Sequence, residues 1–393
     1  MLISHISYAQ HFTKYPGNPV FTPINIVYEQ RGIGSPSVIF KNDTFHMLYA
    51  SGSTDGRGYI SYAFSTNGIN WIRYNNGVPI LFPYSAGWDS FFLDTPEFLY
   101  NDSLKKFVMY YFGDTDSSPE GGAIGIAVSD NLKTWIRYSA NPVLTPGASD
   151  EWDGLFVESP SVAYAWGRYW MVYTGVDSLW RPRIGLAVSS DGFNWVKFPG
   201  NPIIVPKYEW ESLGVATPTI LFDGTSLRVW YCSASIDDFS TDNKVDTLYV
   251  SVAWSNNGIQ WNQDLSVPLI SSITPPPDMR GPWAPDVVYI PDSGKYYMWY
   301  ETAVGFGLAT AKDTATYNLL VKPLSNGKLF IITEKYLWTP NKENILIYNN
   351  SGALLMAFND ISGFIDISFL PTGIYFICIG NSQSNCHKLT VIR

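Results

Sequence analysis

The 393-residue chain has few cysteines, few histidines and few charges for its length. Its three cysteines form no Cys-x-x-Cys pair and its four histidines are scattered, which argues against a zinc site. Charged residues make up 15% and the formal net charge is −9, which disfavours a nucleic-acid or anionic-membrane partner. No uninterrupted apolar run approaches the ~18 residues of a membrane-spanning helix. No segment sustains the 3.6-residue periodicity of helices, which argues against an α/β fold.

What the sequence has instead are aromatic residues, glycine and proline. Aromatics make up 16% of the chain, with 32 Gly and 26 Pro. This composition favours many short strands joined by tight turns. The chain is also longer than the ~250–300 residues at which a single hydrophobic core stops growing, so it needs several domains or a repeated unit.

A repeat of about sixty residues is visible along most of the chain. A small residue and a proline precede a strand five times, and the prolines are 60, 64, 58 and 67 residues apart. Each is followed by an aromatic strand, and the five strands end at Tyr49, Tyr111, Tyr173, Tyr231 and Tyr300. A further strand, a turn and a tryptophan follow, and then an Asn-Pro strand such as 141–144. Each repeat therefore predicts four strands, and the whole predicts an all-β, five-bladed β-propeller.

The fifth repeat lacks its tryptophan and its Asn-Pro strand, and the missing piece stands at the other end of the chain. Residues 12–19 match residues 195–202 position for position. We therefore expect the segment 10–23 to complete the fifth blade and close a ring formed by residues 10–313. Ring closure leaves no blade with an open flank.

The two ends of the chain differ from the repeat. Residues 1–9 are similar to the tail of a signal peptide, with small residues before a cleavage point. Residues 314–393 contain short strands split by turns, which predicts a small Ig-like β-sandwich. Within it, Cys378 and Cys386 flank a turn-like stretch, and a disulfide and two free thiols fit the sequence equally well.

The first strand of each propeller blade lines the central channel and tolerates proline, so residues flanking the five prolines should meet in one funnel. Two positions before the prolines stand Gly34, Asp94, Glu158, Ala216 and Trp283, and one position after them stand Ser37, Glu97, Ser161, Thr219 and Asp286. Four of these ten residues are acids. Paired carboxylates suit the cleavage of a glycosidic bond, because one protonates the leaving oxygen and another activates water or attacks the anomeric carbon.

A second series of acids recurs in nearly every repeat and has a different interpretation. Its members are Glu29, Asp89, Asp153 and Glu211, each seven residues before the repeated proline. A residue needed in every blade is expected to be architectural, as an inter-blade salt bridge or a loop clamp. The acids that do not repeat are better catalytic candidates, because one copy of each role is enough.

The Trp-Asp…Pro, Tyr-Thr-Gly, Ser-x-Asp-Gly-x-x-Trp and Asn-Pro-Val-Leu elements resemble those of the five-bladed propeller glycosidases. That superfamily holds family 43 arabinanases and xylosidases, family 32 invertases and family 130 mannoside phosphorylases. By this resemblance Glu158, in Glu-Ser-Pro, is the general acid and Asp94 tunes its pKa. The base is Asp286 or Glu97, and Asp114 is a further possibility. Blade one departs from the family pattern, because Gly34-Ser35-Pro36 offers no acid where the base usually stands.

Aromatic and basic residues near the inner strands are candidates for binding sugar. Most aromatic residues are expected in the core between blades, with Trp88, Trp283 and Trp180 as exceptions in or near loops. Arg31, Arg57, Arg183 and Arg280 are candidates for binding hydroxyls, carboxylates or phosphate, against the alternative of surface or inter-blade pairing. The resemblance also allows a structural calcium ion, although the sequence shows no metal-ligand signature and no cofactor is expected.

The C-terminal segment is similar to the sorting domain of type IX secretion in Bacteroidetes, through Leu370-Pro371-Thr372-Gly373-Ile374-Tyr375 and the terminal 388–393. This resemblance implies a secreted or cell-surface protein that the secretion machinery recognises through residues 314–393, and we expect the protein to be a monomer. We therefore expect a family-43-like secreted glycoside hydrolase acting on poly- or oligosaccharides. The alternatives are a non-catalytic carbohydrate-binding propeller and a glycoside phosphorylase.

Overall fold

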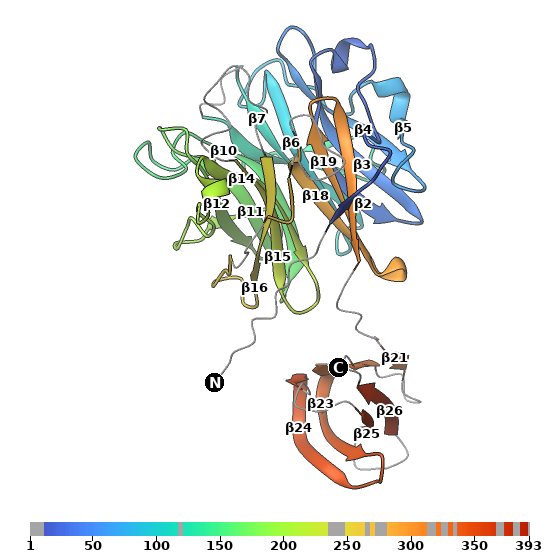
Figure 1. Cartoon of the computed structure of the whole chain (residues 1–393). Coiled ribbons are helices and arrows are strands. Elements are labelled where there is room, and N and C mark those ends of the chain that lie inside the picture. The colour runs from blue at the N-terminus through green and yellow to red at the C-terminus, as the bar shows by residue number, and fades with distance from the viewer. Residues whose placement is uncertain are drawn as a thin grey trace. The chain divides into compact units, whose positions relative to one another are not determined.

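A computed structural model gives the fold of the chain (Figure 1). It describes residues 12–116, 121–234, 248–263, 268–271, 281–312, 320–323, 329–332, 336–366, 373–379 and 386–391. The chain separates into two compact units, residues 1–313 and 314–393. Among the described residues, no helix is long and apolar enough to cross a membrane.

The described part of the first unit contains five antiparallel sheets of four strands each. The first sheet contains β2 (Gly32–Lys41), β3 (Thr44–Gly52), β4 (Gly58–Ser65) and β5 (Ile72–Arg73), and the second contains β6 (Phe92–Asn101), β7 (Lys106–Asp114), β8 (Ala123–Ser129) and β9 (Ile136–Arg137). The third sheet contains β10 (Phe156–Ala165), β11 (Arg168–Val176), β12 (Pro182–Ser189) and β13 (Val196–Lys197). The fourth contains β14 (Gly214–Phe222), β15 (Leu227–Ala234), β16 (Leu248–Ser255) and β17 (Ile270–Ser271). The fifth sheet combines β18 (Trp283–Ile290), β19 (Lys295–Thr302) and β20 (Gly305–Lys312) with β1 (Thr13–Lys14). Short 3₁₀ turns occur at Val27–Glu29, Tyr74–Gly77, Glu209–Glu211 and Pro291–Ser293.

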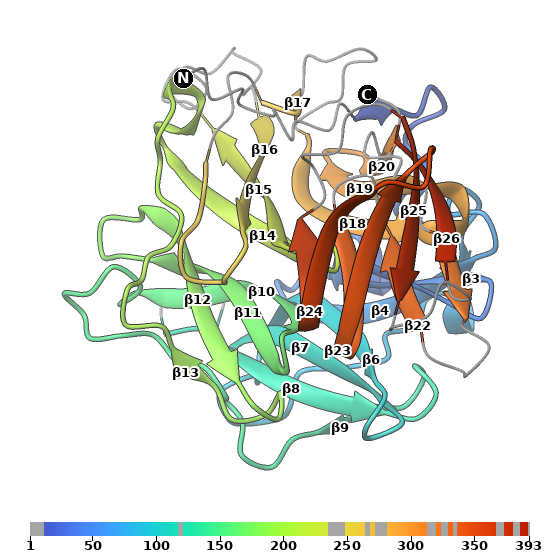
Figure 2. The same cartoon turned by 90° about the horizontal axis from the view of Figure 1, so that it is seen from below.

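The first strands of the five sheets are neighbours in space. Contacts join β2 to β6, β6 to β10, β10 to β14, β14 to β18 and β18 back to β2, which makes a closed ring. Figure 2 shows β6, β10, β14 and β18 toward the middle and β9, β13 and β17 at the periphery. Large buried side chains fill the space between successive sheets, for example Tyr111 and Trp299, which are fully buried. The arrangement is consistent with the predicted propeller fold.

A bulge interrupts each inner strand at the repeated proline. In β6 the pairing register shifts between Asp94 and Glu97, and the other four inner strands shift at the equivalent place. The residue before the proline has a positive φ in all five strands, at Ser35, Thr95, Ser159, Thr217 and Ala284. Proline lacks an N–H and a bulge leaves one residue unpaired. The chain therefore leaves the ladder at this point, and the residues beside the prolines line the central channel.

The N-terminal strand completes the fifth sheet. In β1, Thr13 lies opposite Thr310 and Lys14 opposite Ala309 of β20. The Asn18 amide then donates to Tyr300 Oη and to the Leu308 carbonyl, at 3.0 Å each. In the third sheet, Asn201 makes the same pair of contacts with Tyr173 and Leu186. The match between residues 12–19 and 195–202 in the sequence is therefore also a match in structure.

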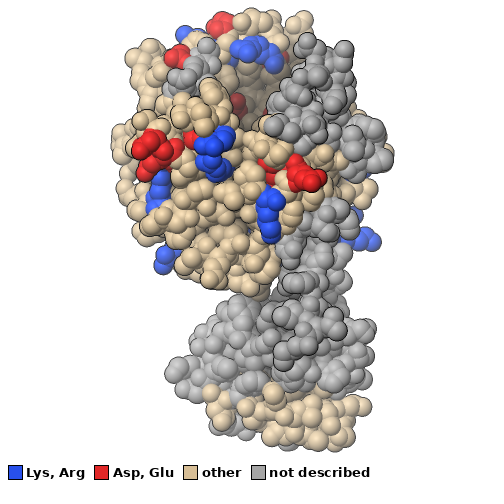
Figure 3. All heavy atoms as spheres, turned by 60° about the vertical axis from the view of Figure 1, so that its left-hand side comes forward, with Lys and Arg blue, Asp and Glu red and all other residues tan. Residues whose placement is uncertain are grey.

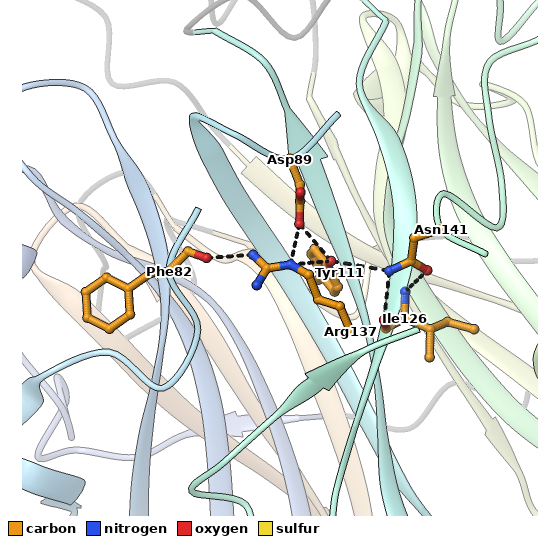
Figure 4. Close-up of polar contacts among 6 residues, drawn as sticks. All are labelled: Phe82, Asp89, Tyr111, Ile126, Arg137 and Asn141. Carbon is orange, nitrogen blue, oxygen red and sulfur yellow. Dashed lines mark hydrogen bonds and ion pairs between the residues drawn. The ribbon is translucent and has the colours of Figure 1, made fainter. Parts of the chain in front are cut away.

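The repeated acids are confirmed as architectural. Asp89 Oδ2 accepts hydrogen bonds from Tyr111 Oη at 2.9 Å and from Arg137 Nε at 2.6 Å (Figure 4). Arg137 also donates to the carbonyl of Phe82, in the segment that leads out of the preceding sheet, at 2.6 Å. These contacts tie one sheet to the next. Equivalent contacts join Glu29 to Tyr49 and Arg73 and Asp153 to Tyr173 and Lys197, whereas Glu211 accepts from the Tyr231 hydroxyl and from the backbone N–H of Lys207.

The second unit forms one six-stranded sheet. Its strands are β21 (Leu320–Pro323), β22 (Leu329–Ile332), β23 (Tyr336–Asn349), β24 (Leu354–Asp366), β25 (Gly373–Ile379) and β26 (Cys386–Val391). The long strand β23 pairs with β24 on one edge and with both β22 and β25 on the other. Cys378 is disulfide-bonded, and the register places Cys386 opposite it. The Ig-like sandwich itself stays a prediction.

Candidate functional site

A cavity of about 210 Å³ opens where the first two inner strands begin. It is lined by the start of β2, the end of β3, the start of β6 and the end of β19. Its charged residues are Arg31, Arg57, Asp94 and Glu301. Elsewhere, acidic and basic side chains are interspersed over the face shown in Figure 3, rather than gathered into one basic patch. The cavity therefore brings four charged residues close together, whereas charged residues on the face in Figure 3 are dispersed.

Ser35 holds two of the carboxylates beside each other. Its hydroxyl donates to Asp94 Oδ1 at 3.0 Å, and its backbone N–H donates to Glu301 Oε2 at 3.0 Å. The left-handed conformation of Ser35, with φ 49°, presents both donors to this side of the strand. The neighbouring Gly34 leaves the necessary space, since a Cβ at that position would lie 2.6 Å from Glu301 Oε2.

Glu158 belongs to the same group of acids. Burial, followed by the charge of Asp94, raises the pKa of Glu158 to about 8. Burial and then Asp94 raise the pKa of Glu301 to about 7, against a lowering by the Ser35 hydrogen bond. Burial also raises the pKa of Asp94 itself, opposed by hydrogen bonds from Thr95 and Ser35. The charge of Asp94 thus contributes to the raised pKa values of both Glu158 and Glu301.

Glu97 and Asp286 lie apart from that group, although we expected all four predicted acids to share one funnel. Both line the narrow channel between the prolines, whereas Asp94 lines the cavity at its mouth. Asp94 and Glu97 are three positions apart on β6 with the bulge between them. Because a strand advances about 3.3 Å per residue, the two carboxylates point to different levels of the channel.

The contacts of the channel pair favour a structural role over that of a catalytic base. Asp286 accepts hydrogen bonds from Val38 N–H of the first sheet at 2.7 Å and from Thr219 of the fourth at 3.2 Å. Glu97 accepts from Ser37 and Ser161, in the sheets on either side of its own. Burial and the charge of Asp286 raise the pKa of Glu97. Each acid therefore joins its own inner strand to both neighbours.

Three of the predicted sugar-binding residues have other partners. The Trp88 ring packs tilted against the Tyr111 ring, with 5.6 Å between centroids, and occupies the space beside Gly125. Trp283 packs against the core between the fourth and fifth sheets. Arg183 forms an ion pair with Asp177 at 3.3 Å. These contacts argue against the expected roles of all three.

Of the remaining candidates, Arg31 and Arg57 both line the cavity. Asp114 is buried at the end of β7, and burial raises its pKa to about 6. Arg280 and the first eleven residues lie outside the described part of the chain. Within the described residues, no cluster of three or more His, Cys, Asp or Glu has the arrangement of a metal site.

Glu301 was missed by the sequence reasoning, although a signal for it exists. It follows the repeated tyrosine of the aromatic strand, a position occupied in the other repeats by Ala50, Phe112, Thr174 and Cys232. Glu301 is the one acid in that column and lies opposite Trp283 of β18. The pairing of the second strand with the inner strand brings the end of the second strand to the cavity.

Comparison with known proteins supports the fold. No family model matches the chain. An uncharacterized protein of Mycobacterium tuberculosis (strain CDC 1551 / Oshkosh) is 27% identical over 240 residues, 58% of this chain and 76% of that protein. The 1,2-β-oligomannan phosphorylase of Thermoanaerobacter sp. (strain X514) is 24% identical over 201 residues, 48% of this chain and 62% of the phosphorylase.

Solved structures of similar fold cover 71–78% of this chain. A putative glycoside hydrolase from Parabacteroides distasonis ATCC 8503 aligns with a TM-score of 0.60 at 15% identity, over 78% of this chain and 97% of that one. A second structure comes from the GH130 family of mannoside phosphorylases, which contains glycoside hydrolases that target β-1,2 mannosidic linkages in Candida mannan. It aligns with a TM-score of 0.61 at 17% sequence identity, over 78% of this chain and 95% of that one. A thermostable family-43 glycoside hydrolase aligns with a TM-score of 0.54 at 18% sequence identity, over 71% of this chain and 88% of that one.

Proposed function

We propose that this protein is a five-bladed propeller enzyme that cleaves glycosidic bonds in poly- or oligosaccharides with the carboxyl groups of Asp94, Glu158 and Glu301. The observation that carries the proposal is the pairing of Asp94 and Glu301 through Ser35 at one mouth of the channel, with Glu158 near enough for the charge of Asp94 to raise its pKa. Glycosidic cleavage requires two carboxyl groups in different protonation states. The glycoside hydrolases and phosphorylases of similar fold support the same class of chemistry.

Glu158 suits the role of general acid. Its pKa of about 8 keeps it protonated at neutral pH, so it has a proton to give to the leaving oxygen. Glu301, with a pKa of about 7, is partly ionised under the same conditions and suits the role of base. The C–O bond to the leaving sugar then breaks as Glu158 protonates its oxygen. Water adds to the anomeric carbon and gives its proton to Glu301.

Asp94 acts through its two neighbours. Its carboxylate is fixed by hydrogen bonds from Ser35 Oγ and Thr95 N–H, so it cannot turn away from the group. Its negative charge disfavours ionisation of Glu158 and of Glu301. Activity should therefore follow a bell-shaped pH profile with its optimum between about 7 and 8, because the base must be ionised and the acid protonated.

A second candidate function is phosphorolysis, in which phosphate replaces water as the nucleophile. Arg31 and Arg57 line the cavity, and arginine binds phosphate through paired N–H donors. The structure records no ion pair for the Arg31 guanidinium among the described residues, whereas Arg57 lies 3.5 Å from Asp55. The phosphorylase among the relatives makes the same reaction worth testing.

We further propose that residues 314–393 serve export, as the resemblance to a sorting domain implies, and that the protein acts outside the cell. The argument rests on the terminal sequence elements and on the separation of these residues into a compact unit. None of the acids of the site lies in that unit.

The test is a panel of aryl pentosides and hexosides together with β-1,2-mannan, arabinan, xylan and levan, each with and without phosphate. We expect cleavage of at least one substrate, and loss of at least a hundredfold in kcat for Glu158→Gln and for Glu301→Gln. Glu209→Gln, a substitution of an exposed acid outside the cavity, is the matched control and should leave activity unchanged. Sugar phosphate as product would favour phosphorolysis, and binding without cleavage would leave only a carbohydrate-binding propeller.

A further inference from the structure

An exposed tryptophan lies at the same end of the sheets as the acids. Trp180 is in the connection between β11 and β12 and is 55% exposed; its neighbour Leu179 is 67% exposed. The equivalent connection in the first sheet, between β3 and β4, contributes Arg57 to the cavity. Large apolar side chains favour burial, so this exposure needs an explanation.

The backbone holds Trp180 in a conformation that tryptophan does not favour. Its φ is +59°, in the left-handed region where a Cβ causes strain. Asp177 maintains this conformation, because its carboxylate accepts hydrogen bonds from the N–H groups of Leu179 and Arg181 and from the Arg181 guanidinium. Arg183 adds an ion pair to the same carboxylate. The connection is therefore a rigid support with an indole at its tip.

Neighbouring side chains place the indole close to the general acid. The Trp180 ring contacts the Phe156 ring edge-on, with 5.9 Å between centroids. Phe156 and Glu158 are two residues apart on β10, so they point to the same face about 7 Å from each other. The Trp180 ring is thus separated from the Glu158 carboxyl group by little more than the width of one or two sugar rings.

We propose that Trp180 is a stacking platform for a sugar ring one or two units away from the bond that is cleaved. One face of a pyranose ring carries mainly C–H groups, and an indole offers a flat apolar face with a polar N–H at its edge. A fixed platform at this distance binds a longer chain more tightly than a short one. The proposal rests on the function proposed above and adds a subsite that sets preference for chain length.

A matched control exists on the same sheet. Trp166 is 41% exposed and has φ +50°, but it lies in the β10–β11 hairpin, at the opposite end of the sheet. There the positive φ belongs to a tight Trp166-Gly167 turn, as hairpin geometry requires. Trp166→Ala therefore removes an exposed tryptophan with a left-handed backbone conformation and leaves the mouth of the channel unchanged.

The experiment measures how far each polysaccharide, β-1,2-mannan, arabinan, xylan or levan, slows the migration of the Glu158→Gln protein in a native gel, which reports its affinity for that polysaccharide. We expect Trp180→Ala in that background to lower affinity for the retarding polysaccharide about tenfold, Trp180→Phe to restore much of it, and Trp166→Ala to change it less than twofold. The melting temperature of each variant shows whether it is folded.

Two outcomes overturn the inference in different ways. Retardation of the Glu158→Gln protein that Trp180→Ala does not reduce refutes the platform and leaves the proposed function standing. If no polysaccharide retards that protein and the wild type cleaves nothing in the panel, the proposed function fails and the platform with it.

Discussion

Replacing Glu158 by glutamine should abolish activity and at the same time stabilise the folded protein at neutral pH. The pKa of Glu158 rises from 4.5 in an unfolded chain to about 8 in the folded one. Between these two pH values the folded state holds a proton that the unfolded state has released, so stability falls as pH rises. Glutamine has a similar shape but no proton to lose, and the variant should not show that fall.

The size of the effect follows from the shift in pKa. Each pKa unit corresponds to about 1.4 kcal/mol, and pH 7 lies 2.5 units above the ordinary pKa of 4.5, so the expected gain is at most roughly 3.5 kcal/mol. Because Glu158 keeps some contact with solvent, the measured value should lie below that limit. At pH 4.5 the two proteins should differ little.

The assay is urea unfolding of residues 1–393 at pH 5, 7 and 8, with Glu211→Gln as the matched control. Glu211 accepts hydrogen bonds from Tyr231 and from the Lys207 N–H as part of a clamp, so its substitution should cost about 1.5–3 kcal/mol. A loss of stability in Glu158→Gln comparable with that of the control would refute the reasoning, because it would make Glu158 a structural anion.

Three further outcomes follow from other parts of the structure. Arg137→Met should destabilise the protein by about 3–5 kcal/mol in urea unfolding, since Asp89 would be left as an unpaired buried charge; an unchanged midpoint would show that the clamp contributes nothing. Gly34→Ala should lower kcat at least tenfold with little change in melting temperature, because the added methyl displaces Glu301; equal activity would mean that the position of this carboxylate is unimportant. A chain ending at residue 313 should retain full kcat, and its loss in a folded protein would place part of the site in the second unit.

Much of the fold could be predicted because it repeats. The Asn-Pro element at residues 18–19 and at residues 201–202 makes the same side-chain contacts in both places, so an alignment within the sequence is also an alignment of structure. The repeated acids such as Asp89 were recognised as architectural by the same argument, since one role per sheet requires one residue per sheet.

The site was harder to predict, because it depends on which level of the channel a side chain reaches. The bulge at Pro96 separates Asp94 from Glu97, and the spacing of the two residues in the sequence does not show that their carboxylates reach different levels of the channel. Glu301 comes from a second strand and is linked to Asp94 through the backbone and hydroxyl of Ser35. Trp88 was expected to bind sugar from a loop before an inner strand, but Gly113 and Gly125 make room for its ring against the sheet.

The central claim is that sugar binds at the mouth formed by Asp94, Glu158 and Glu301. The most direct measurement is a crystal structure of the Glu158→Gln protein soaked with the oligosaccharide that the wild type cleaves. We expect a glycosidic oxygen within about 3.2 Å of the substituted side chain at position 158 and the anomeric carbon on the side of Glu301. A sugar chain bound away from this cavity, with neither side chain in contact with a glycosidic bond, would contradict the account.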